Sequence, residues 1–587
     1  MRKCLPNLFV FIALLVFMSG WSALSAQDIT FTQPDSNLGI TSTIGQFGCA
    51  WGDYNGDGYM DLLVSGRSSP HILYRNDNGV FTNVSAEAFT DNATAQGAIW
   101  GDFDNDGDLD LFTGQGGVHL YRNDDGVFTD ISTEAGISTY AATYTIWGVT
   151  AADYDMDGDL DVAFAGGNSV TAPGASAGPA YILQNNDMVF SDVAIEILGF
   201  SITLESWNPQ WVDINNDGLM DLWLPTIRTP LEPCALFINE ESGSFSYIDT
   251  TTSGLNAKSA ISSCWGDYDN DGDLDVFITP FSGDTAGNSR LYSNEENYFV
   301  NVSTGTPLDS AYANSRGACF GDYDNDGDQD LVVGRLYGQT EKLFRNDGTT
   351  WTDVSVESGV SAVSGTYRGA MFIDYDNDGF LDIFFNEATK ILLHNPGNQN
   401  HWIAIKPKGV TNNTAGIGAR IRAVTGSLKQ IRYVQAGAGG MTQGFLWPHF
   451  GLGANTTVDS LIVTWPNGVV DVAINVAADN YYTFVEGIGI SGINEKPQQA
   501  LNYTLKQNYP NPFNPLTTIE FTLPVKSEVR LVVSNILGEV VEVLAAGDYA
   551  AGNHTIRFNA VDLSAGIYFY SLQADQFSQV KKLVLLK

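Results

Sequence analysis

The nine residues Asp53-Tyr-Asn-Gly-Asp-Gly-Tyr-Met-Asp61 decide the fold, because the same pattern returns six more times along the chain. The seven copies begin at Asp53, Asp102, Asp153, Asp213, Asp267, Asp322 and Asp374. Successive first aspartates are 49 to 60 residues apart. An internal repeat of about 50 residues is typical of propeller blades and of solenoid turns.

A second landmark follows each acidic loop and indicates a β-hairpin. Tight-turn dipeptides such as Asn78-Gly79 and Asp125-Gly126 lie between apolar runs, which is the pattern of a two-residue hairpin turn. The first acidic loop is also flanked by strand-like runs, with Ala50-Trp51 before it and Leu62-Leu63-Val64 after it. Each repeat therefore supplies four short strands, which is the plan of a propeller blade. We expect an all-β chain with a seven-bladed β-propeller at residues 27–396.

The N-terminal segment indicates how the ring closes. Residues Ile29–Ile40 are similar to Val127–Ile137, which form the fourth-strand region of a repeat. The seventh repeat ends its third strand near Leu393-His394-Asn395. We therefore expect the N-terminal strand to complete the last blade, a closure that a solenoid does not need.

The acidic loops have the composition of a calcium site. Oxygen-bearing side chains at positions 1, 3 and 5 converge on one point, and a glycine at position 6 permits the sharp turn. Position 7 is Leu219 in one copy and Phe380 in another, so the backbone carbonyl there is the expected ligand. An EF-hand requires Glu at position 12, and no copy has one. The loops hold 30 of the 68 acidic residues, and without a cation each cluster would repel itself.

The loops and the two-hairpin repeat resemble the FG-GAP/VCBS repeats of integrin-α-type propellers. The resemblance implies that positions 1, 3, 5, 7 and 9 coordinate Ca²⁺ at up to seven sites. The implied ligands are Asp53, Asn55, Asp57, Tyr59 and Asp61; Asp102, Asp104, Asp106, Asp108 and Asp110; Asp153, Asp155, Asp157, Asp159 and Asp161; Asp213, Asn215, Asp217, Leu219 and Asp221; Asp267, Asp269, Asp271, Asp273 and Asp275; Asp322, Asp324, Asp326, Asp328 and Asp330; and Asp374, Asp376, Asp378, Phe380 and Asp382. Asn at position 3 lowers the charge of the first and fourth loops, so these sites are expected to be weaker.

Two further β-rich regions follow the repeats. The motifs Gly416–Arg422, His449–Gly453 and Thr464–Gly468 resemble the ASPIC/UnbV domain of cartilage acidic proteins, which we place at residues 397–487 before a linker at 488–502. Residues 503–587 open with Asn508-Tyr-Pro-Asn-Pro-Phe-Asn-Pro515 and resemble the C-terminal sorting domain of type IX secretion substrates, expected to be a β-sandwich. That resemblance implies recognition by the type IX machinery and export across an outer membrane.

The N-terminus and the overall charge restrict where the protein works. Met1-Arg2-Lys3 and the apolar run Leu8–Met18 predict a signal peptide at residues 1–26, and no later run is long enough for a membrane helix. The formal charge of -40 repels nucleic-acid phosphates, so no nucleic-acid partner is expected. We therefore expect a secreted or cell-surface protein. The remaining cysteines, Cys49, Cys234, Cys264 and Cys319, are expected to be buried free thiols, with a disulfide left open.

The sequence favours a binding protein over an enzyme. The six histidines and the absence of G-x-S-x-G, H-E-x-x-H and C-x-x-C motifs offer no convergent catalytic set. We expect a non-catalytic, calcium-binding protein that mediates adhesion or binds a protein or glycan through the insertions 166–179, 225–233 and 280–289. The alternative is a secreted polysaccharide lyase with a cleft lined by Arg228, Arg316, Arg335 and Arg368.

Overall fold

The structure, a computed structural model, is an all-β chain. It describes residues 29–34, 38–41, 48–66, 69–91, 94–114, 117–140, 145–167, 177–200, 203–204, 206–226, 234–240, 244–250, 252–255, 260–280, 289–309, 315–335, 338–348, 350–365, 369–386, 390–437, 442–494, 504–508, 510–523, 527–536, 539–549, 552–561, 563–574 and 577–586. The predicted signal peptide, most of the three insertions and residues 495–503 of the predicted linker lie outside these residues.

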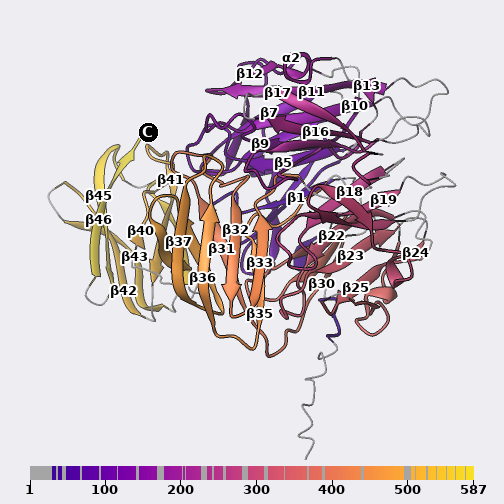
Figure 1. Cartoon of the computed structure of the whole chain (residues 1–587). Coiled ribbons are helices and arrows are strands. Elements are labelled where there is room, and N and C mark those ends of the chain that lie inside the picture. The colour runs from indigo at the N-terminus through magenta and orange to yellow at the C-terminus, as the bar shows by residue number, and fades with distance from the viewer. Residues whose placement is uncertain are drawn as a thin grey trace, which may run out of the picture. The chain divides into compact units, whose positions relative to one another are not determined.

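Each acidic repeat forms one small antiparallel sheet, and the strands follow one another in chain order (Figure 1). The first three sheets are β1 (Cys49–Gly52), β2 (Asp61–Val64), β3 (Ile72–Asn76) and β4 (Phe81–Asn83); β5 (Gly97–Gly101), β6 (Asp110–Gly114), β7 (Val118–Asp124) and β8 (Val127–Asp130); and β9 (Thr145–Ala152), β10 (Asp161–Gly167), β11 (Ala177–Asn186) and β12 (Val189–Asp192).

The next four sheets follow the same plan, the last with three named strands. They are β14 (Gln210–Val212), β15 (Asp221–Leu224), β16 (Ala235–Glu240) and β17 (Ser244–Asp249); β18 (Ala260–Gly266), β19 (Asp275–Pro280), β20 (Arg290–Glu295) and β21 (Tyr298–Asn301); β22 (Ser315–Gly321), β23 (Asp330–Arg335), β25 (Lys342–Asn346) and β26 (Trp351–Asp353); and β28 (Gly369–Ile373), β29 (Asp382–Asn386) and β30 (Ile391–Leu393). The short elements are α1 (Ser85–Ala88), α2 (Ala194–Leu198), β13 (Thr203–Leu204), η2 (Pro307–Asp309), β24 (Gln339–Thr340), η3 (Val360–Ala362) and β27 (Ser364–Gly365).

Local sequence explains the two hairpins of each repeat. Asn78 and Gly79 have φ of 56° and 84°, and Asp125 and Gly126 have 55° and 86°, which are the positive angles that a tight hairpin turn requires. The first two strands of a repeat are buried on both faces, as in β1 and β2, because neighbouring sheets pack on either side. The predicted hairpin turns are therefore present in these repeats.

A cycle of asparagine side chains links the seven sheets. An Asn Nδ2 at the end of the third strand, or just after it, donates to the position-2 carbonyl of the preceding acidic loop, as Asn123 does to Tyr54 (2.8 Å). The same bond occurs at Asn185, Asn239, Asn294, Asn346 and Asn395. Asn76 of the first repeat donates to the carbonyl of Tyr375 in the seventh (2.7 Å), so the hydrogen bonds lead from the last sheet back to the first.

The N-terminal segment pairs with the last repeat. Thr32 and His394 form an antiparallel bridge, in which each backbone N–H donates to the other's carbonyl at 3.0 and 2.7 Å. Ile29 and Phe31 are buried in the same apolar cluster as Ile383 and Leu393. The predicted pairing of this segment with the seventh repeat is therefore present.

Residues 397–494 form longer strands, drawn in orange in Figure 1. They are β31 (His401–Lys408), β32 (Arg420–Thr425), β33 (Leu428–Tyr433), β34 (Thr442–Gln443), β35 (His449–Gly453), β36 (Thr457–Thr464), β37 (Val470–Ala477), β38 (Asn480–Val485) and β39 (Gly489–Asn494). One sheet has the order β33-β32-β36-β37, and the alternating burial of β32 matches the alternation of its sequence. The predicted linker is wrong at Gly489–Asn494, because the backbone of this glycine-rich segment forms a sheet edge.

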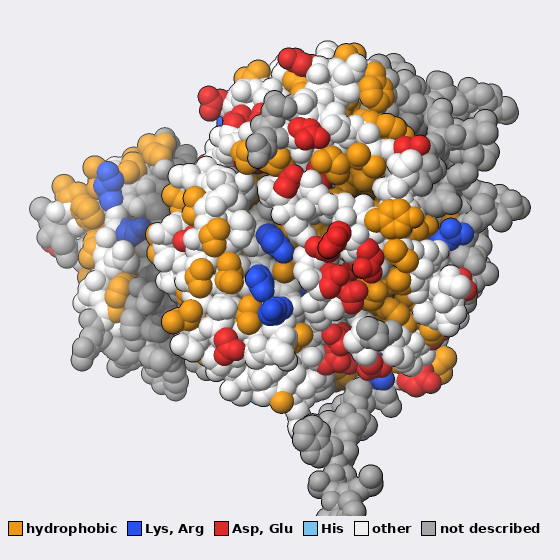
Figure 2. Space-filling model, in the orientation of Figure 1, with side chains coloured by type: hydrophobic (Ala, Val, Ile, Leu, Met, Phe, Trp, Pro, Cys, Tyr) orange, Lys and Arg blue, Asp and Glu red, His pale blue; other side chains and the backbone are white. Residues whose placement is uncertain are grey.

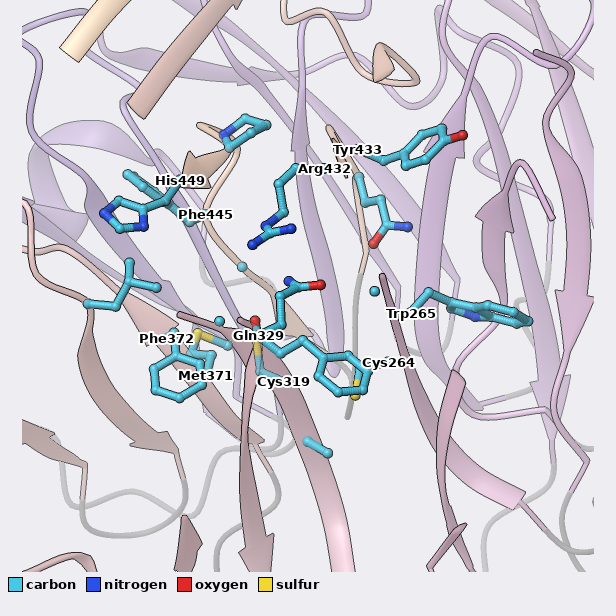
Figure 3. A pocket seen from close by; sticks show the side chains of 18 of the residues that line it. Cys264, Trp265, Cys319, Gln329, Met371, Phe372, Arg432, Tyr433, Phe445 and His449 are labelled. Carbon is cyan, nitrogen blue, oxygen red and sulfur yellow. The ribbon is translucent and has the colours of Figure 1, made fainter. Parts of the chain in front are cut away.

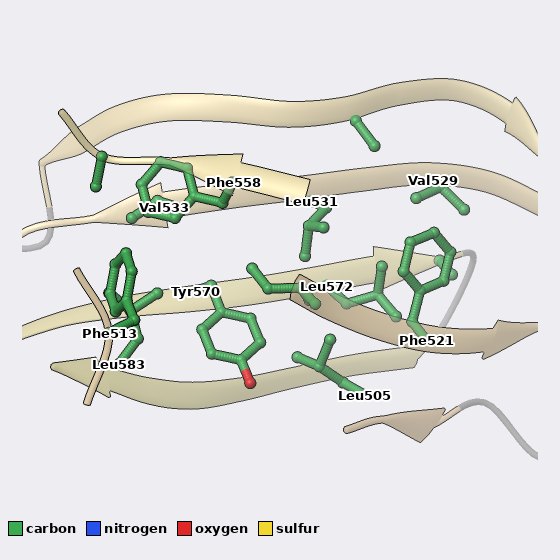
Figure 4. Packing of buried hydrophobic residues seen from close by; sticks show 14 of the residues in the cluster. Leu505, Phe513, Phe521, Val529, Leu531, Val533, Phe558, Tyr570, Leu572 and Leu583 are labelled. Carbon is green, nitrogen blue, oxygen red and sulfur yellow. The ribbon is translucent and has the colours of Figure 1, made fainter. Parts of the chain in front are cut away.

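Residues Ile490–Lys587, together with Asn480–Thr483, form a second compact unit, and its apolar core lies between Leu505 and Leu585. Its strands are β40 (Thr504–Leu505), β41 (Leu516–Leu523), β42 (Ser527–Ser534), β43 (Val540–Tyr549), β44 (Gly552–Asn559), β45 (Gly566–Ala574) and β46 (Phe577–Leu585). They make two sheets, β40-β41-β44 and β43-β42-β45-β46. Figure 4 shows the buried side chains of both sheets, among them Phe521, Leu531 and Tyr570, directed toward one another.

Candidate metal sites

The acidic loops are built by paired strands and by their own first aspartate. Each loop leaves the first strand of a sheet and ends at the first residue of the second strand, so positions 1 and 9 are held at the same end of a strand pair. In the second loop, Asp102 Oδ1 accepts the N–H of Asp106 (3.1 Å) and Oδ2 accepts that of Gly107 (2.9 Å). Gly107 has φ of 105°, which a residue with a side chain rarely adopts. These bonds curl the loop around its own carboxylates.

Position 4 of the loop has a role that sequence reasoning missed. The position-4 asparagines Asn105, Asn216, Asn270, Asn325 and Asn377 all have φ between 56° and 59°. Each donates from Nδ2 to the position-6 carbonyl of the following loop, and Asn377 donates to Gly58 of the first loop (2.8 Å). The available signal was the recurrence of Asn at this position in five of the seven copies.

The position-9 aspartate is a buried hub in every loop. Its Oδ2 accepts the N–H of position 2 and its Oδ1 accepts the N–H of the third-strand or following Asn, as Asp110 does from Phe103 (2.9 Å) and Asn123 (2.8 Å). The equivalent residues are Asp61, Asp161, Asp221, Asp275, Asp330 and Asp382, and all seven are fully buried. Position 9 thus orients the loop as well as offering oxygen atoms to it.

The predicted ligand side chains come together in several loops. Oxygen atoms from positions 1, 3 and 9 lie within 4.8 Å of one another in the second, third and sixth loops, and those from positions 1, 3 and 5 do so in the fifth. In the seventh loop the group is Asp376, Asp378 and His394. Carboxylate and carbonyl oxygens at this spacing suit a hard cation such as Ca²⁺.

The electrostatics of the loops also fit a cation. Burial, followed by repulsion from neighbouring aspartates, raises the pKa of Asp102 and of Asp153 to about 7. The same two causes act on Asp275, where the pKa is raised to about 9. Such carboxylates lose charge at neutral pH unless a positive charge compensates them. A bound divalent cation would supply that compensation.

His394 is a candidate site residue that sequence reasoning did not place at the metal. Its Nδ1 lies 3.5 Å from Asp376 Oδ2 and 3.3 Å from Asp382 Oδ1. The signal was its place immediately before Asn395, which bonds to the position-9 aspartate. Only the seventh copy has His here, so no repeated pattern marked it.

Residues 397–453 contact all seven acidic loops. Lys406 Nζ bonds Asp53 Oδ2 (2.9 Å), the Thr414 hydroxyl bonds Asp102 Oδ2, and the Tyr433 hydroxyl bonds Asp213 Oδ2 (3.2 Å). The remaining contacts are Thr411 O beside Gly158, Arg420 Nη2 to Gly272 O (3.1 Å), Gly453 N to Asn325 O (2.8 Å) and His449 Nε2 with Gly379 O (3.1 Å). Figure 2 shows a group of Lys and Arg side chains near the centre of the view, beside a group of Asp and Glu side chains.

The segment between β33 and β35 reaches the first strands of several repeats. Ala436 O accepts hydrogen bonds from the backbone of Ala151 (3.2 Å) and the hydroxyl of Thr150 (2.7 Å). β34 pairs in parallel with β1, and the Gln443 side chain bonds both the N–H and the carbonyl of Trp100. The segment is therefore hydrogen-bonded to β1, β5 and β9, the first strands of three repeats.

A cavity of about 140 Å³ lies between this segment and strands β18, β22 and β28 (Figure 3). Figure 3 shows the Arg432 side chain directed toward Gln329. The Arg432 guanidinium is bonded to Gln430 Oε1 (3.1 Å) and to the carbonyl of Ile431 (2.8 Å). Cys264 and Cys319 line the same cavity as free thiols, and burial raises the pKa of Cys319 to about 11. Cys49 and Cys234 are also free and buried.

The arginines of the lyase alternative do not form a described cleft. Arg316 is buried with its guanidinium 5.5 Å from the ring centre of Trp207, and Arg335 Nη1 donates to Thr340 O (3.3 Å). Arg228 and Arg368 lie outside the described residues. Among the helices that the structure describes, none has the length and apolar composition needed to cross a membrane.

Comparison with protein-family models identifies three regions of the chain. An FG-GAP-like repeat model matches residues 53–113, 111–164, 267–333 and 322–385. The ASPIC and UnbV model matches residues 409–491, and the secretion system C-terminal sorting domain matches residues 507–586. The chain therefore carries FG-GAP-like repeats, an ASPIC/UnbV domain and a sorting domain, as the sequence motifs predict. The sorting domain indicates export across the outer membrane to the cell surface or the medium.

Curated relatives and solved structures are similar to parts of the chain. Cartilage acidic protein 1 of Mus musculus is 24% identical over 271 residues, which are 43% of this chain and 41% of that protein. The Homo sapiens protein is 25% identical over 238 residues, 38% of this chain and 35% of that protein. The chain thus matches less than half the length of these relatives. BBS1N in complex with ARL6DN aligns over 62% of this chain and 96% of that chain, with 10% identity and a TM-score of 0.37, and Saccharomyces cerevisiae Sqt1 over 76% and 98%, with 12% identity and a TM-score of 0.35.

Proposed function

We propose that this exported protein is a calcium-stabilised, seven-bladed β-propeller that binds a protein or glycan without catalysing a reaction on it. The observation that carries the calcium assignment is the sevenfold recurrence of one loop with its position-1 and position-9 aspartates in the same places. The cycle of asparagine hydrogen bonds from the seventh sheet back to the first supports the closed ring.

The chemistry of the loops matches the metal. When bound, Ca²⁺ would supply the positive charge that lets the buried carboxylates stay ionised. The side chains at positions 1, 3, 5 and 9 and the carbonyl at position 7 would hold it, and His394 stands beside the seventh site. The first and fourth loops, with Asn55 and Asn215, offer less negative charge.

Calcium removal tests the assignment directly. Extracellular calcium modules have Kd values of about 10⁻⁴ to 10⁻³ M, so at about 1 mM Ca²⁺ each site adds about 0.4 to 1.4 kcal/mol to the free energy of unfolding. Seven sites together add about 3 to 10 kcal/mol, and we expect EDTA to lower Tm by many degrees. The measurement is a melting curve with and without EDTA, paired with elemental analysis of the purified protein. A protein that carries no calcium and melts identically in both buffers refutes the assignment.

The proposed binding role rests on the contacts of the acidic loops and on the kinds of domain that the chain carries. The seven loops resemble one another and all contact the ASPIC/UnbV domain, so we assign them to the scaffold and place the ligand on other surfaces. FG-GAP-like repeats and ASPIC/UnbV are not typical enzyme domains. Screening residues 27–494 against glycan and matrix-protein arrays identifies the ligand class. Release of shortened polysaccharide chains in that screen would favour the lyase alternative.

A further inference from the structure

Three different side chains of the ASPIC/UnbV domain bond to the same atom of three acidic loops. Lys406, Thr414 and Tyr433 bond to Oδ2 of the position-1 aspartate in the first, second and fourth loops, respectively. The three donors come from β31, from the segment before β32 and from the end of β33, so no single local motif explains the coincidence.

The oxygen that these three side chains contact also accepts a backbone N–H of its own loop. In all three loops Oδ2 also accepts the N–H of the position-6 glycine, at 3.1 Å from Gly58, 2.9 Å from Gly107 and 3.1 Å from Gly218. Oδ1 faces the loop itself: Asp102 Oδ1 and Asp213 Oδ1 each accept the N–H of the position-5 aspartate (3.1 Å), and Asp53 Oδ1 is buried without a hydrogen-bond partner in the structure. Donors on Oδ2 therefore fix the carboxylate plane and leave Oδ1 directed toward the centre of the loop.

We propose that the ASPIC/UnbV domain supplies the outer hydrogen-bond shell of the first, second and fourth calcium sites, so that calcium binding and docking of this domain stabilise each other. The inference rests on the proposed calcium sites. Residues that orient a metal ligand through a hydrogen bond typically change metal affinity 10- to 100-fold when they are removed. Lys406, Thr414 and Tyr433 are positioning residues in this sense.

The neutral donors give a cleaner test than the lysine. Replacing Thr414 or Tyr433 removes a hydrogen bond and leaves the charge of the site unchanged. Replacing Lys406 also removes a positive charge that repels Ca²⁺, so the two effects on affinity oppose each other. The single Tyr433 hydroxyl proton is shared between Asp213 Oδ2 (3.2 Å) and Asn216 Oδ1 (3.0 Å), so this side chain contacts the fourth loop at two points.

The coupling is reciprocal by thermodynamic necessity. If the docked domain strengthens calcium binding at these sites, calcium must strengthen docking by the same factor. We expect the backbone amides around Thr414 to exchange hydrogen faster in EDTA than in calcium, because the segment loses a partner that the metal holds in place. Hydrogen exchange around Thr414 reports the docking of the ASPIC/UnbV domain and does not measure the calcium occupancy of the sites.

The experiment compares the full-length parent with the double variant Thr414→Val/Tyr433→Phe by calcium titration. We expect two sites to weaken 10- to 100-fold while the others keep the parent's affinity. Thr414→Ser retains the hydroxyl, so the second site should bind calcium with the affinity of the parent. Thr457→Val and Tyr298→Phe are matched controls at exposed positions on β36 and β21. Near-UV circular dichroism of the calcium-loaded double variant checks that it is folded.

The outcomes separate the two proposals. A parent that binds calcium and a folded double variant with the same isotherm overturn the outer-shell inference and leave the calcium assignment standing. A parent that binds no calcium overturns both. Weakened binding in the double variant, with rescue by Thr414→Ser and calcium-dependent exchange around Thr414, supports the coupling.

Discussion

At the scale of single residues, the roles that could be predicted from sequence belong to residues that recur from loop to loop and carry metal-ligand atoms. Alternating carboxylates and a recurring position-6 glycine predicted that positions 1, 3 and 5 converge, and the oxygen group of the fifth loop has this composition, whereas the second and third loops group positions 1, 3 and 9. The role of Asn123 and its equivalents could not be foreseen, because a hydrogen bond to Tyr54 across 69 residues depends on how neighbouring sheets pack. His394 was not predicted as a site residue, because histidine occurs at this position in one copy alone and forms no repeated pattern.

Glu486 illustrates how one buried carboxylate positions a site residue. It accepts hydrogen bonds from the N–H groups of Val410 (2.7 Å) and Thr411 (2.8 Å) and from Asn467 Nδ2 (2.8 Å). Burial alone would raise the pKa of Glu486, but the hydrogen bonds from Thr411, Val410 and Asn467 outweigh it and hold the pKa at about 2. The segment that carries Thr414 is thus fixed from the domain's own side.

We expect Glu486→Gln to lower the free energy of unfolding by about 1–3 kcal/mol at pH 7, because both carboxylate oxygens accept hydrogen bonds. The donor end of the Gln amide would face either the three backbone N–H groups of residues 410–412 or the donors of Thr411 and Asn467. A lowered pKa means that the carboxylate stabilises the fold above its unfolded-state value and ceases to do so as pH falls toward 2. The difference in Tm between parent and variant should therefore shrink between about pH 4.5 and pH 2. Equal melting curves at pH 7, with Lys408→Met as a neutral surface control, would contradict this role.

At the scale of elements, hairpins and alternating strands were predictable, whereas sheet edges were not. The Asn78-Gly79 turn follows from local backbone preference, and the alternation of β32 follows from having one buried face. β39 was mistaken for linker because its glycines disfavour a strand locally, and only pairing with a sheet stabilises it. The pairing of the N-terminal segment with the seventh repeat, an isolated bridge between Thr32 and His394, was predictable because the segment's sequence is similar to a strand region elsewhere in the chain.

The N-terminal segment at residues 29–34, which pairs with the seventh repeat, leads to a prediction about stability. Ile29 and Phe31 are buried against the sixth and seventh repeats, so the double variant Ile29→Ala/Phe31→Ala should cost about 3 kcal/mol or more through lost burial and cavities. Gln33→Ala, at an exposed neighbouring position, should stay within about 0.5 kcal/mol of the parent. Chemical denaturation of both variants in calcium measures the difference. If the double variant unfolds like the control, the segment contributes nothing to the seventh repeat.

At the scale of the whole molecule, the order of the domains was predictable from motifs, but their interplay was not. The ASPIC/UnbV sequence motifs do not indicate that the domain contacts the acidic loops. The positive charges of Lys406, Arg420 and Arg432 are separated from one another in the sequence. Folding brings them to the acidic loops of a chain whose net charge is -40. Local attraction between opposite charges at this contact offsets part of the self-repulsion that so acidic a protein accumulates.

The sorting domain is separable from the rest in structural terms, and its removal should therefore affect export and not folding. Among the described residues, the apolar cluster at Leu505–Leu585 contains only side chains of that region, and four apolar clusters of the repeats contain none from it. Deleting residues 504–587 should leave a protein with the parent's calcium-dependent melting curve that accumulates in the periplasm, because the outer-membrane step lacks its signal. Cell fractionation and immunoblotting measure its location, and fusing residues 504–587 to an unrelated periplasmic protein provides the converse control. Normal amounts of the truncated chain at the surface or in the medium would show that another segment directs export, whereas a truncated chain that fails to fold would show that the two units depend on each other.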